Sequence, residues 1–579
     1  MKRLALLLVL VLGTAAMFAQ GLLEKSKVTG SFQIDGNYYW EDKGIGITGE
    51  DINGNKFGGY GFGKIQYQLG NFTAGFRYEA YQIFKMTGLP EELGNGNGSG
   101  IANYFATYDN GTIGVTVGDI YDQFGNGLIF RTYEEWTLGF DNSLRGIRAV
   151  FRPCNGITLK GLYGKQRLYW DSYENHGLVR GLDGEWDINS SIESLNNSKF
   201  KATVGASFVS KHENDKQKEY EGVIYDLPQN VGAYAGRMNL GYGRFTFSAE
   251  YARKINDPSA FNNWIYRDGQ ELLASLSYSQ KGLGVVLQAK RVDNMSFKSV
   301  RTEEENKLDI GFIPPLNYTH SHSLPSMFSY ATQPLGEMGI QFQVNYTIPK
   351  KTLLGGKYGT KLAFNFSQVN DIKRDSIMVN GVNTLNMMGT KGYDSPFFAV
   401  GDRMFYRDFN FEIEKKINAK WNLTLMYINL YYDMEQIEGH VGAEPVKAHF
   451  AFGEVIYKIN KKHSVRLELQ HMWDNIAQDY EVPVGSEGNF TKRGNWTAFL
   501  LEYTIAPKWF VSVADKYNYG NPIADNRNHY FTGSFGYIKD QTRIAISGGR
   551  QSEGLICVGG VCRPVPASSG VSITMTTSF

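Results

Sequence analysis

The last nine residues of the chain are Val571-Ser572-Ile573-Thr574-Met575-Thr576-Thr577-Ser578-Phe579. Apolar residues occupy positions 571, 573, 575 and 579, whereas hydroxyl residues occupy positions 572, 574, 576 and 578. Successive side chains of a β-strand point to opposite faces, so this stretch predicts a strand with one apolar face and one polar face. The strand closes on an aromatic residue, Phe579.

The opposite end of the chain has the layout of a secretory signal peptide. Met1-Lys2-Arg3 is a short basic segment, residues 4–12 are apolar, and small residues precede an expected cleavage after Ala19. The apolar run is too short to span a bilayer as a helix. We therefore expect a signal peptide at residues 1–19 and one mature domain at residues 20–579.

The composition of the chain limits the classes of protein to which it can belong. Aromatic residues make up 14% of its 579 residues, and the formal net charge is +1. A charge so near zero argues against general nucleic-acid binding. No apolar run after the signal peptide approaches the roughly 20 residues of a transmembrane helix. An exported, aromatic-rich chain of this kind is typical of a barrel whose apolar band is spread over alternate positions.

The alternation of the last strand recurs throughout the mature chain. Its clearest instance is residues 340–348, and Asn110-Gly111 between two alternating runs is a strong hairpin signal. Connections alternate between short turns and long segments such as 121–144 and 292–338. The pattern predicts an all-β fold, a closed antiparallel transmembrane β-barrel of about 24 strands (22 to 26) with short periplasmic turns and long extracellular loops.

A barrel in lipid must close, because an open edge strand would leave a row of backbone groups without hydrogen-bond partners. We therefore expect the strand near Val28 to pair with the strand that ends at Phe579. A final alternating strand with a terminal Phe resembles the outer-membrane β-barrels of Gram-negative bacteria. The resemblance implies a location in the cell outer membrane, an insertion signal at Phe579, and outer-membrane lipid and the barrel-assembly machinery as partners.

Two of the three cysteines, Cys557 and Cys562, flank Val558-Gly559-Gly560-Val561. In an oxidising compartment this close pair is expected to form a disulfide across a two-residue Gly-Gly turn and to fix the shape of a surface loop. The alternative is a metal pair, but further thiol or imidazole ligands are missing from the neighbouring sequence. Cys154 is expected to be a free residue in a turn.

The polar face of the predicted strands should line the lumen, and it carries charges of both signs. A wet conduit that selects solutes is one interpretation of these residues, and cross-strand ion pairs that brace a wide barrel are the other. The candidate lumen-facing charges are Glu250, Glu412, Glu414, Arg466, Glu468, Glu502 and Arg543.

The long segment that begins at Gly118 is the most distinctive loop of the sequence. Its glycines permit sharp bends, and its apolar residues at 124 and 128–130 do not suit a freely exposed loop. We expect it to fold back into the lumen and narrow it; an ordinary strand followed by a loop is the alternative. The candidate constriction residues are Asp119, Phe124, Gly125, Gly127, Arg131, Glu134, Glu135 and Arg145.

Other patterns give weak signals. The glycine-rich residues 94–100 lack the Lys-Ser/Thr of a phosphate-binding loop, which favours a flexible surface loop. His320 and His322 would need further ligands to hold a metal. No arrangement of a nucleophile with a His base is recognisable. We therefore expect no enzyme activity, no catalytic residue, no cofactor and no metal.

The chain also resembles an uncharacterised family of outer-membrane barrels of the Bacteroidota, classed as a domain of unknown function. The resemblance rests on Cys557-Val558-Gly559-Gly560-Val561-Cys562-Arg563, on residues 118–131, on Pro314-Pro315-Leu316 with Gly336-Glu337 downstream, and on the terminal Ser578-Phe579. It covers essentially the whole mature chain. It implies location and fold but contributes no catalytic or binding residues.

Two functions from different classes agree with these observations. The first is a passive or loop-gated channel for solutes, favoured by the polar lumen face and the wide circumference that about 24 strands imply. The second is a non-conducting structural or interaction barrel, accessory to secretion or surface assembly, with secretion or surface proteins as partners. No separate plug domain is expected before the barrel, which disfavours energy-coupled uptake of the receptor type.

Overall fold

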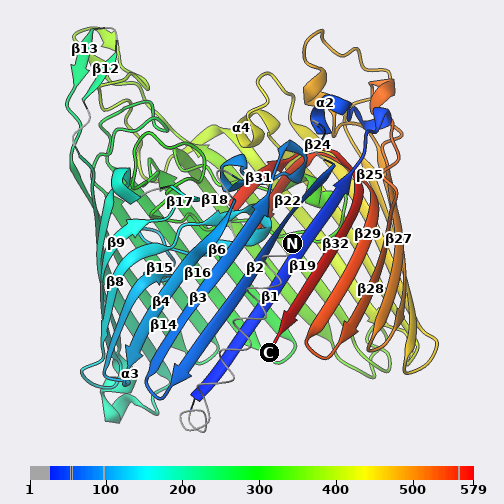
Figure 1. Ribbon diagram of the computed structural model, residues 1–579, viewed down its shortest axis with the longest axis horizontal. Coiled ribbons are helices and arrows are strands. Elements are labelled where there is room, and N and C mark those ends of the chain that lie inside the picture. The colour runs from blue at the N-terminus through cyan, green and yellow to red at the C-terminus, as the bar shows by residue number, and fades with distance from the viewer. Residues whose placement is uncertain are drawn as a thin grey trace.

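The computed structural model describes residues 26–579 apart from residues 53, 55, 95–97, 172, 215–216, 221 and 559–560. The expected signal peptide, residues 1–19, and the expected Gly559-Gly560 turn lie outside the described residues. Twenty-four antiparallel strands form one continuous sheet that closes on itself (Figure 1). The predicted fold class and the predicted strand number are therefore confirmed.

The strands of the barrel wall are eight to seventeen residues long. Their bounds are β1 (Ser26–Tyr39), β2 (Phe57–Leu69), β3 (Phe72–Gln82), β4 (Ser99–Asp109), β5 (Ile113–Ile120), β8 (Leu144–Phe151), β9 (Ile157–Gln166), β10 (Leu178–Asp187), β11 (Phe200–His212), β14 (Asn230–Tyr242), β15 (Phe245–Lys254), β16 (Gly269–Gln280), β17 (Leu283–Asp293), β18 (Gly336–Ile348), β19 (Thr360–Ile372), β22 (Val400–Lys416), β23 (Trp421–Tyr432), β24 (Val446–Lys458), β25 (His463–Trp473), β26 (Trp496–Ile505), β27 (Trp509–Tyr517), β28 (Thr532–Lys539), β29 (Thr542–Gln551) and β32 (Ser568–Ser578).

The first and last strands close the barrel. β1 pairs with β32 from Ser31 opposite Ser578 to Tyr39 opposite Gly570. The N–H of Gly30 donates to the carbonyl of Phe579 (3.0 Å), and the N–H of Phe579 donates to the carbonyl of Gly30 (2.9 Å). The expected pairing of the strand near Val28 with the carboxyl-terminal strand is thus present.

The alternation in the sequence becomes the two faces of the wall. On β32, Val571 and Ile573 are 41% and 45% exposed on the outer surface. Thr574, between Ile573 and Met575, points inward and donates from Oγ1 to Oδ1 of Asp35 on β1 (2.6 Å). An apolar outer face over a polar inner face is the arrangement of a barrel that spans lipid.

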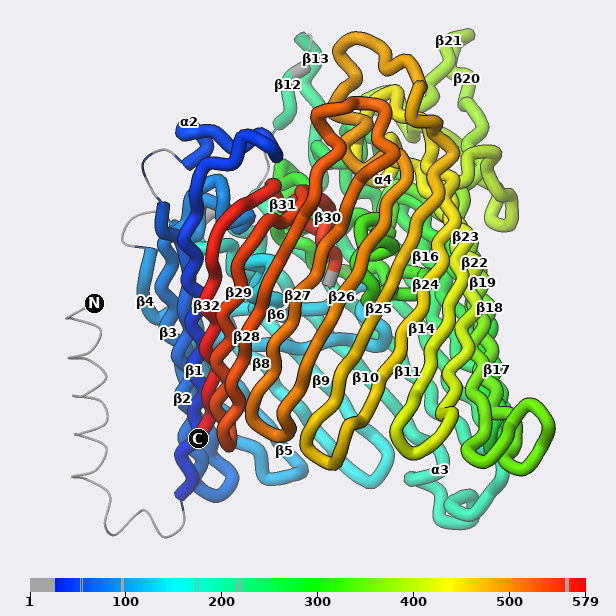
Figure 2. Tube along the Cα trace, turned by 90° about the vertical axis from the view of Figure 1, so that its right-hand side faces the viewer, coloured from blue at the N-terminus to red at the C-terminus, as the bar shows by residue number. Residues whose placement is uncertain are grey.

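The two rims of the barrel differ in the length of their connections. One rim carries tight turns, such as 70–71 and 281–282, together with the short helix α3 (Ile188–Ser191). The other carries long connections with the helices α2 (Gly49–Ile52) and α4 (Met434–Glu438) and the hairpins β12 (Lys218–Tyr220)–β13 (Val223–Tyr225) and β20 (Met378–Val379)–β21 (Val382–Asn383) (Figures 1 and 2). None of the helices in the described residues is long and apolar enough to cross a membrane.

Three of the long connections turn into the barrel. The first inward loop, residues 121–143, contains β6 (Glu134–Glu135), the 3-10 helix η5 (Trp136–Leu138) and β7 (Phe140–Asp141). The second inward loop, residues 294–335, contains the 3-10 helix η8 (Pro325–Phe328). The disulfide hairpin, residues 554–565, is formed by β30 (Gly554–Val558) and β31 (Val561–Val565). β6 pairs with β7 and β30 pairs with β31, so neither hairpin belongs to the sheet of the wall.

We predict that Gly30→Val weakens closure of the barrel. A Cβ atom at Gly30 would lie 2.4 Å from Cζ of the Phe579 ring, so a side chain there displaces the terminal aromatic residue. Overpacking of this kind costs about 1–3 kcal/mol, and the midpoint of thermal unfolding should fall.

The matched control is Gly236→Val on β14. Gly236 shares the outer face with Tyr234 and Met238, both exposed, and an added Cβ there meets nothing within 4 Å. An equal loss of stability in both variants would show that the packing of the Phe579 ring does not require glycine at position 30.

Candidate functional site

Apolar side chains fill part of the lumen on the long-loop side. Phe124, Leu128, Ile129 and Phe130 of the first inward loop are fully buried and pack in one cluster with residues of the second inward loop. The same cluster contains inward-facing wall residues, namely Leu162, Val179, Val209, Val231, Ala233, Ala235, Ala252 and Val292. A wall facing water would carry polar residues at these positions, so this part of the wall is built to be covered.

The tip of the first inward loop is bound to the wall at Glu250 on β15. Gly125 has a left-handed backbone (φ 53°), and a Cβ there would lie 2.5 Å from the Glu250 carboxylate. The backbone N–H and the side-chain amide of Asn126 both donate to Oε2 of Glu250, at 2.7 and 2.8 Å. Glu250, one of the candidate lumen-facing charges, thus binds the tip of the first inward loop.

A cluster of buried charges holds the base of the same loop. Arg77 on β3 donates to Glu79 (2.6 Å) and to Glu134 and Asp141 of the loop. Arg167 donates to Glu79 (2.8 Å) and Asp141 (2.5 Å). Each buried carboxylate has an arginine partner, which is the condition under which buried charge is tolerated.

The pKa of Asp141 shows how strongly this cluster favours the ionised state. Burial by itself raises the pKa of the Asp141 carboxyl, but Arg167 and Arg77 lower it to about 2. The ionised Asp141 carboxylate therefore stabilises the folded protein fully at pH values above the ordinary pKa of Asp, about 4. This stabilisation is lost as the pH falls through about 2.

Six of the eight candidate constriction residues lie in the first inward loop, which packs on inward-facing wall residues. They are Phe124, Gly125, Gly127, Arg131, Glu134 and Glu135. The guanidinium of Arg131 stacks between the rings of Tyr133 (4.0 Å) and Phe312 (3.9 Å). Glu134 accepts from Lys64 on β2 (2.5 Å). Glu135 caps η5 by accepting from the N–H of Thr137 (3.2 Å).

The other two candidates, Asp119 and Arg145, lie on the outer side of the wall and not in the lumen. β5 continues to Ile120 and β8 begins at Leu144, so strand alternation still applies to both residues. Arg145 shares its face of β8 with the exposed Ile147 and stacks 4.5 Å from the exposed Tyr104 ring. It binds Asp119 through Nε (2.9 Å) and Nη2 (2.8 Å).

The second inward loop crosses the lumen from β17 to the far wall. Nε2 of His320 lies 2.9 Å from Asp408 on β22. The N–H of Leu324 donates to Gln470 on β25 (3.0 Å). Around η8, Leu324, Met327 and Phe328 pack against apolar residues on the inner faces of β23–β26, which are Met426, Ile428, Leu430, Phe450, Phe452, Met472, Trp496 and Ala498.

The sequence carries a signal for this second loop that was not among the predictions above. Leu324, Met327, Phe328 and Tyr330 are too apolar for a freely exposed connection, which is the criterion that singled out the first inward loop. The two loops bind one another in the lumen. The N–H of Arg131 donates to the carbonyl of Ile310 (2.8 Å), and the N–H of Phe312 donates to the carbonyl of Gly127 (2.9 Å).

The remaining candidate lumen charges occupy inward positions on the strands. Arg466 lies between Glu454 and Glu468, with 2.5 Å to each, and Glu414 pairs with Lys361 (2.9 Å). Glu502 accepts from Oγ1 of Thr504 (3.2 Å). The other two members of the set are Glu412 on β22 and Arg543 on β29, whose guanidinium lies 5.7 Å from the Phe510 ring.

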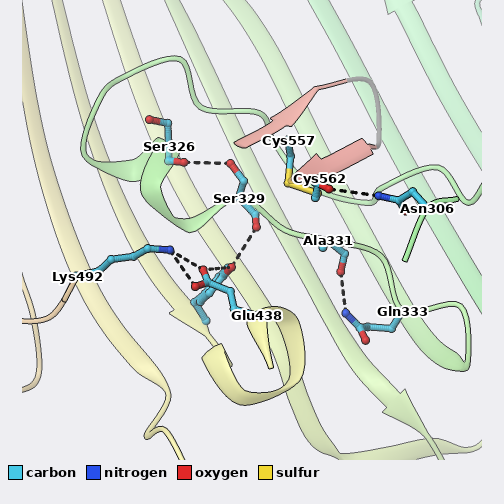
Figure 3. The surroundings of a disulfide bond; sticks show 10 residues. Asn306, Ser326, Ser329, Ala331, Gln333, Glu438, Lys492, Cys557 and Cys562 are labelled. Atoms are coloured by element: carbon cyan, nitrogen blue, oxygen red, sulfur yellow. Dashed lines mark hydrogen bonds and ion pairs between the residues drawn. A yellow bond between two sulfur atoms is a disulfide. The ribbon is translucent and has the colours of Figure 1, made fainter. Parts of the chain in front are cut away.

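The disulfide hairpin reaches both inward loops. Cys557 and Cys562 form a disulfide, and Cys154 is a free, exposed cysteine. The guanidinium of Arg563 donates to the carbonyl of Leu138 (2.8 Å), and Nδ2 of Asn306 donates to the carbonyl of Cys562 (3.2 Å; Figure 3). The hairpin expected to shape a surface loop therefore holds the interior loops.

A cavity of about 540 Å³ lies between the disulfide hairpin, α4 and the two inward loops. Glu438, on its wall, accepts from Lys492 (2.9 Å; Figure 3) and Tyr432 (2.7 Å). Burial by itself raises the pKa of Glu438, but hydrogen bonds from His440, Lys492 and Tyr432 lower it to about 2. The hydrogen bond to Glu438 in turn raises the pKa of His440.

His320 and His322 are engaged within the protein. His320 pairs with Asp408, as described above, and the His322 ring lies 3.8 Å from the Phe452 ring, with Nδ1 3.7 Å from Glu468. In the part of the chain that the structure describes, no group of three or more His, Cys, Asp or Glu residues is placed to hold a metal ion.

Comparison with known proteins gives one family and a set of distant folds. The family described as "Family of unknown function (DUF6029)" matches residues 1–579. No curated protein matches the chain. The siderophore receptor PirA from Pseudomonas aeruginosa is 10% identical, with 96% of this chain and 80% of that chain covered and a TM-score of 0.40.

Two further solved structures show a similar degree of likeness. The translocation pore of the P pilus usher PapC is 8% identical, with 95% and 99% covered and a TM-score of 0.41. OccAB3 from Acinetobacter baumannii is 9% identical, with 96% and 100% covered and a TM-score of 0.33. At these identities and scores the likenesses carry no argument about function.

We predict that Arg77→Ala loosens the first inward loop. Removing one partner from a buried ion-pair network leaves the other charges uncompensated, which costs about 3–5 kcal/mol. Amide hydrogen exchange of residues 121–143 should therefore become much faster.

The control for Arg77→Ala is Arg152→Ala. Arg152 forms an exposed ion pair with Asp109 (3.2 Å), with both side chains 38% exposed, and exposed pairs contribute about 0–1 kcal/mol. Unchanged exchange of residues 121–143 in the Arg77 variant would contradict a role for this cluster in holding the loop.

Proposed function

The chain belongs to the family of unknown function DUF6029, and we propose that it is an integral outer-membrane β-barrel whose lumen its own loops keep closed. In this proposal it acts as a non-conducting structural or interaction barrel for secretion or surface proteins. The apolar outer face, the pairing of Gly30 with Phe579 and the resemblance to barrels of the Bacteroidota support this location. The proposal includes export of the chain by the signal peptide at residues 1–19 and its insertion into the outer membrane by the barrel-assembly machinery.

The observation that carries the closed lumen is the apolar inner wall beneath the two inward loops. Burying a large apolar side chain contributes about 1.5–3 kcal/mol, so exposing Phe124, Leu128, Ile129 and Phe130 to water costs about 6–12 kcal/mol. At a cost of about 6 kcal/mol, the loop would be withdrawn from the lumen in only about one molecule in twenty-five thousand. This magnitude favours a lasting plug over a passive, open channel.

A loop-gated channel is the second candidate, favoured by the polar residues on the inner wall. Glu412, Glu454, Glu468 and Glu502 outnumber Arg466 on neighbouring strands beside the second inward loop. A cation path opened by a ligand or partner would use such a surface. In that case the binding energy of the ligand must offset the cost of exposing the inner wall.

We predict that the wild-type protein is silent in planar bilayers and that a variant lacking residues 121–143 conducts. The deletion removes the side chains that fill the cluster on the β9–β17 side of the lumen. A milder variant, Phe130→Asp, places an unpaired charge in the same cluster and should produce intermittent openings.

The control deletes residues 378–383, the β20–β21 hairpin on the long-loop rim, which should leave the protein silent. Stable openings of the wild-type protein would refute the closed barrel and favour the channel. Silence of both loop variants, with folding intact, would show that the second inward loop and the disulfide hairpin seal the lumen alone.

A further inference from the structure

The rim of short turns carries a one-sided concentration of positive charge. The connections on this rim from β14 to β29 are residues 243–244, 281–282, 349–359, 417–420, 459–462, 506–508 and 540–541. Their basic residues, all exposed, are Arg244, Lys281, Lys350, Lys351, Lys357, Lys420, Lys461, Lys462 and Lys508, and their acidic residue is Asp540. We call these basic residues the basic arc; several of its turns lie in a row at the lower end of Figure 2.

The charge of the basic arc is not neutralised by carboxylates of the protein. The ion pair nearest to it joins Lys361 and Glu414, at the ends of β19 and β22 (2.9 Å). Within the described residues, none of the side chains of the basic arc has a carboxylate partner. Because the whole chain has a net charge of only +1, the arc is a local feature.

Three of the four remaining connections on the same rim lack this feature. Residues 70–71 are Gly-Asn and residues 110–112 are Asn-Gly-Thr, all uncharged. Arg152, in the turn after β8, pairs with Asp109 (3.2 Å). Short turns therefore do not require lysine, and the lysines of the basic arc need another explanation.

Aromatic residues on the outer face give the depth of the basic arc in the membrane. Lys420 precedes Trp421, whose ring packs 4.4 Å from Tyr457. Lys508 comes just before Trp509, whose ring lies 4.2 Å from Tyr537. Trp and Tyr rings on the outer face of a barrel lie at the level of the lipid headgroups. The flexible stem of a neighbouring lysine places its ammonium in the phosphate layer.

The longest turn of the basic arc adds an apolar contact at the same depth. In residues 349–359, Leu353 is 98% exposed and Leu354 is 68% exposed, between Lys351 and Lys357. Apolar side chains flanked by cations suit the boundary between acyl chains and anionic headgroups.

We propose that the basic arc binds anionic phospholipid headgroups of the leaflet that surrounds the short turns. The inference rests on the proposed membrane location and adds a lipid partner to it. Successive turns are two strands apart, about 10 Å, which is close to the screening length at physiological salt. The ammonium groups of different turns therefore interact with phosphate largely independently, and the attraction grows with the number of lysines.

An acidic protein docked from the periplasm is the competing occupant of this surface. It would engage the tips of the turns but would not need lysines beside the lipid-facing rings of Trp421 and Trp509. The position of the basic arc next to this aromatic girdle therefore favours lipid.

The test measures the association of spin-labelled phosphatidylglycerol and phosphatidylcholine with the full chain reconstituted in phosphatidylcholine vesicles. We expect a severalfold preference for phosphatidylglycerol at low salt that declines as salt is added. The combined variant Lys420→Gln, Lys461→Gln, Lys462→Gln and Lys508→Gln should lose most of the preference, and arginine at the same four positions should restore it.

The matched control replaces four exposed lysines of the opposite rim, Lys43→Gln, Lys56→Gln, Lys391→Gln and Lys447→Gln, and should keep the preference. An equal association of both lipids with the wild-type protein overturns the inference, as does a preference that survives the four glutamines or high salt. Failure of the wild-type protein to insert into any vesicle contradicts the membrane location itself.

Discussion

The structure depends on one constraint: every backbone N–H and C=O of the wall must have a hydrogen-bond partner. The pairing of the first strand with the last gives partners to the two strands that would otherwise be open edges. β1 and β32 are more than five hundred residues apart in sequence, and they pair from Ser31 to Tyr39. The terminal Phe579 ring packs over Gly30, where a side chain would not fit. Closure leaves no edge strand in the sheet, and it fixes which residues face outward and which face the interior.

A closed ring of 24 strands encloses more space than its own inward side chains can fill. This protein fills the space with chain: two long connections enter the lumen and bind each other through Arg131 and Ile310. The inner wall matches them locally, apolar where Phe124 and Phe328 pack and charged where Arg77 meets Glu134. Wall and loops are therefore complementary where they meet, and this close packing resembles that of a folded core.

Local sequence patterns predicted the strands of the wall, whereas contacts between residues far apart in sequence determine where the loops lie. Period-two alternation gave the strands, the two unequal rims and the closing pair, because each is readable within a few residues. Strand alternation also explains why Asp119 and Arg145 lie outside the lumen. The loop was expected to begin at Gly118, but β5 continues to Ile120, so its side chains still alternate between the two faces of the wall. The contacts between loops and wall join residues far apart in sequence. Asn126 and the wall residue Glu250 that it binds are 124 residues apart, and no local pattern links them. The apolar residues of the second inward loop were nevertheless visible, and the criterion applied to the first loop would have found them.

The position of the disulfide hairpin links the two inward loops to the strand that closes the barrel. The hairpin lies in the connection between β29 and β32, two neighbouring strands of the wall. From there Arg563 reaches the first inward loop at Leu138, and the carbonyl of Cys562 reaches the second at Asn306. A short cross-linked hairpin gains little from loop-closure entropy, so its contribution is a fixed shape that fits between two loops. In the proposed closed barrel, the segment that holds both inward loops is thus the one that directly precedes the closing strand β32.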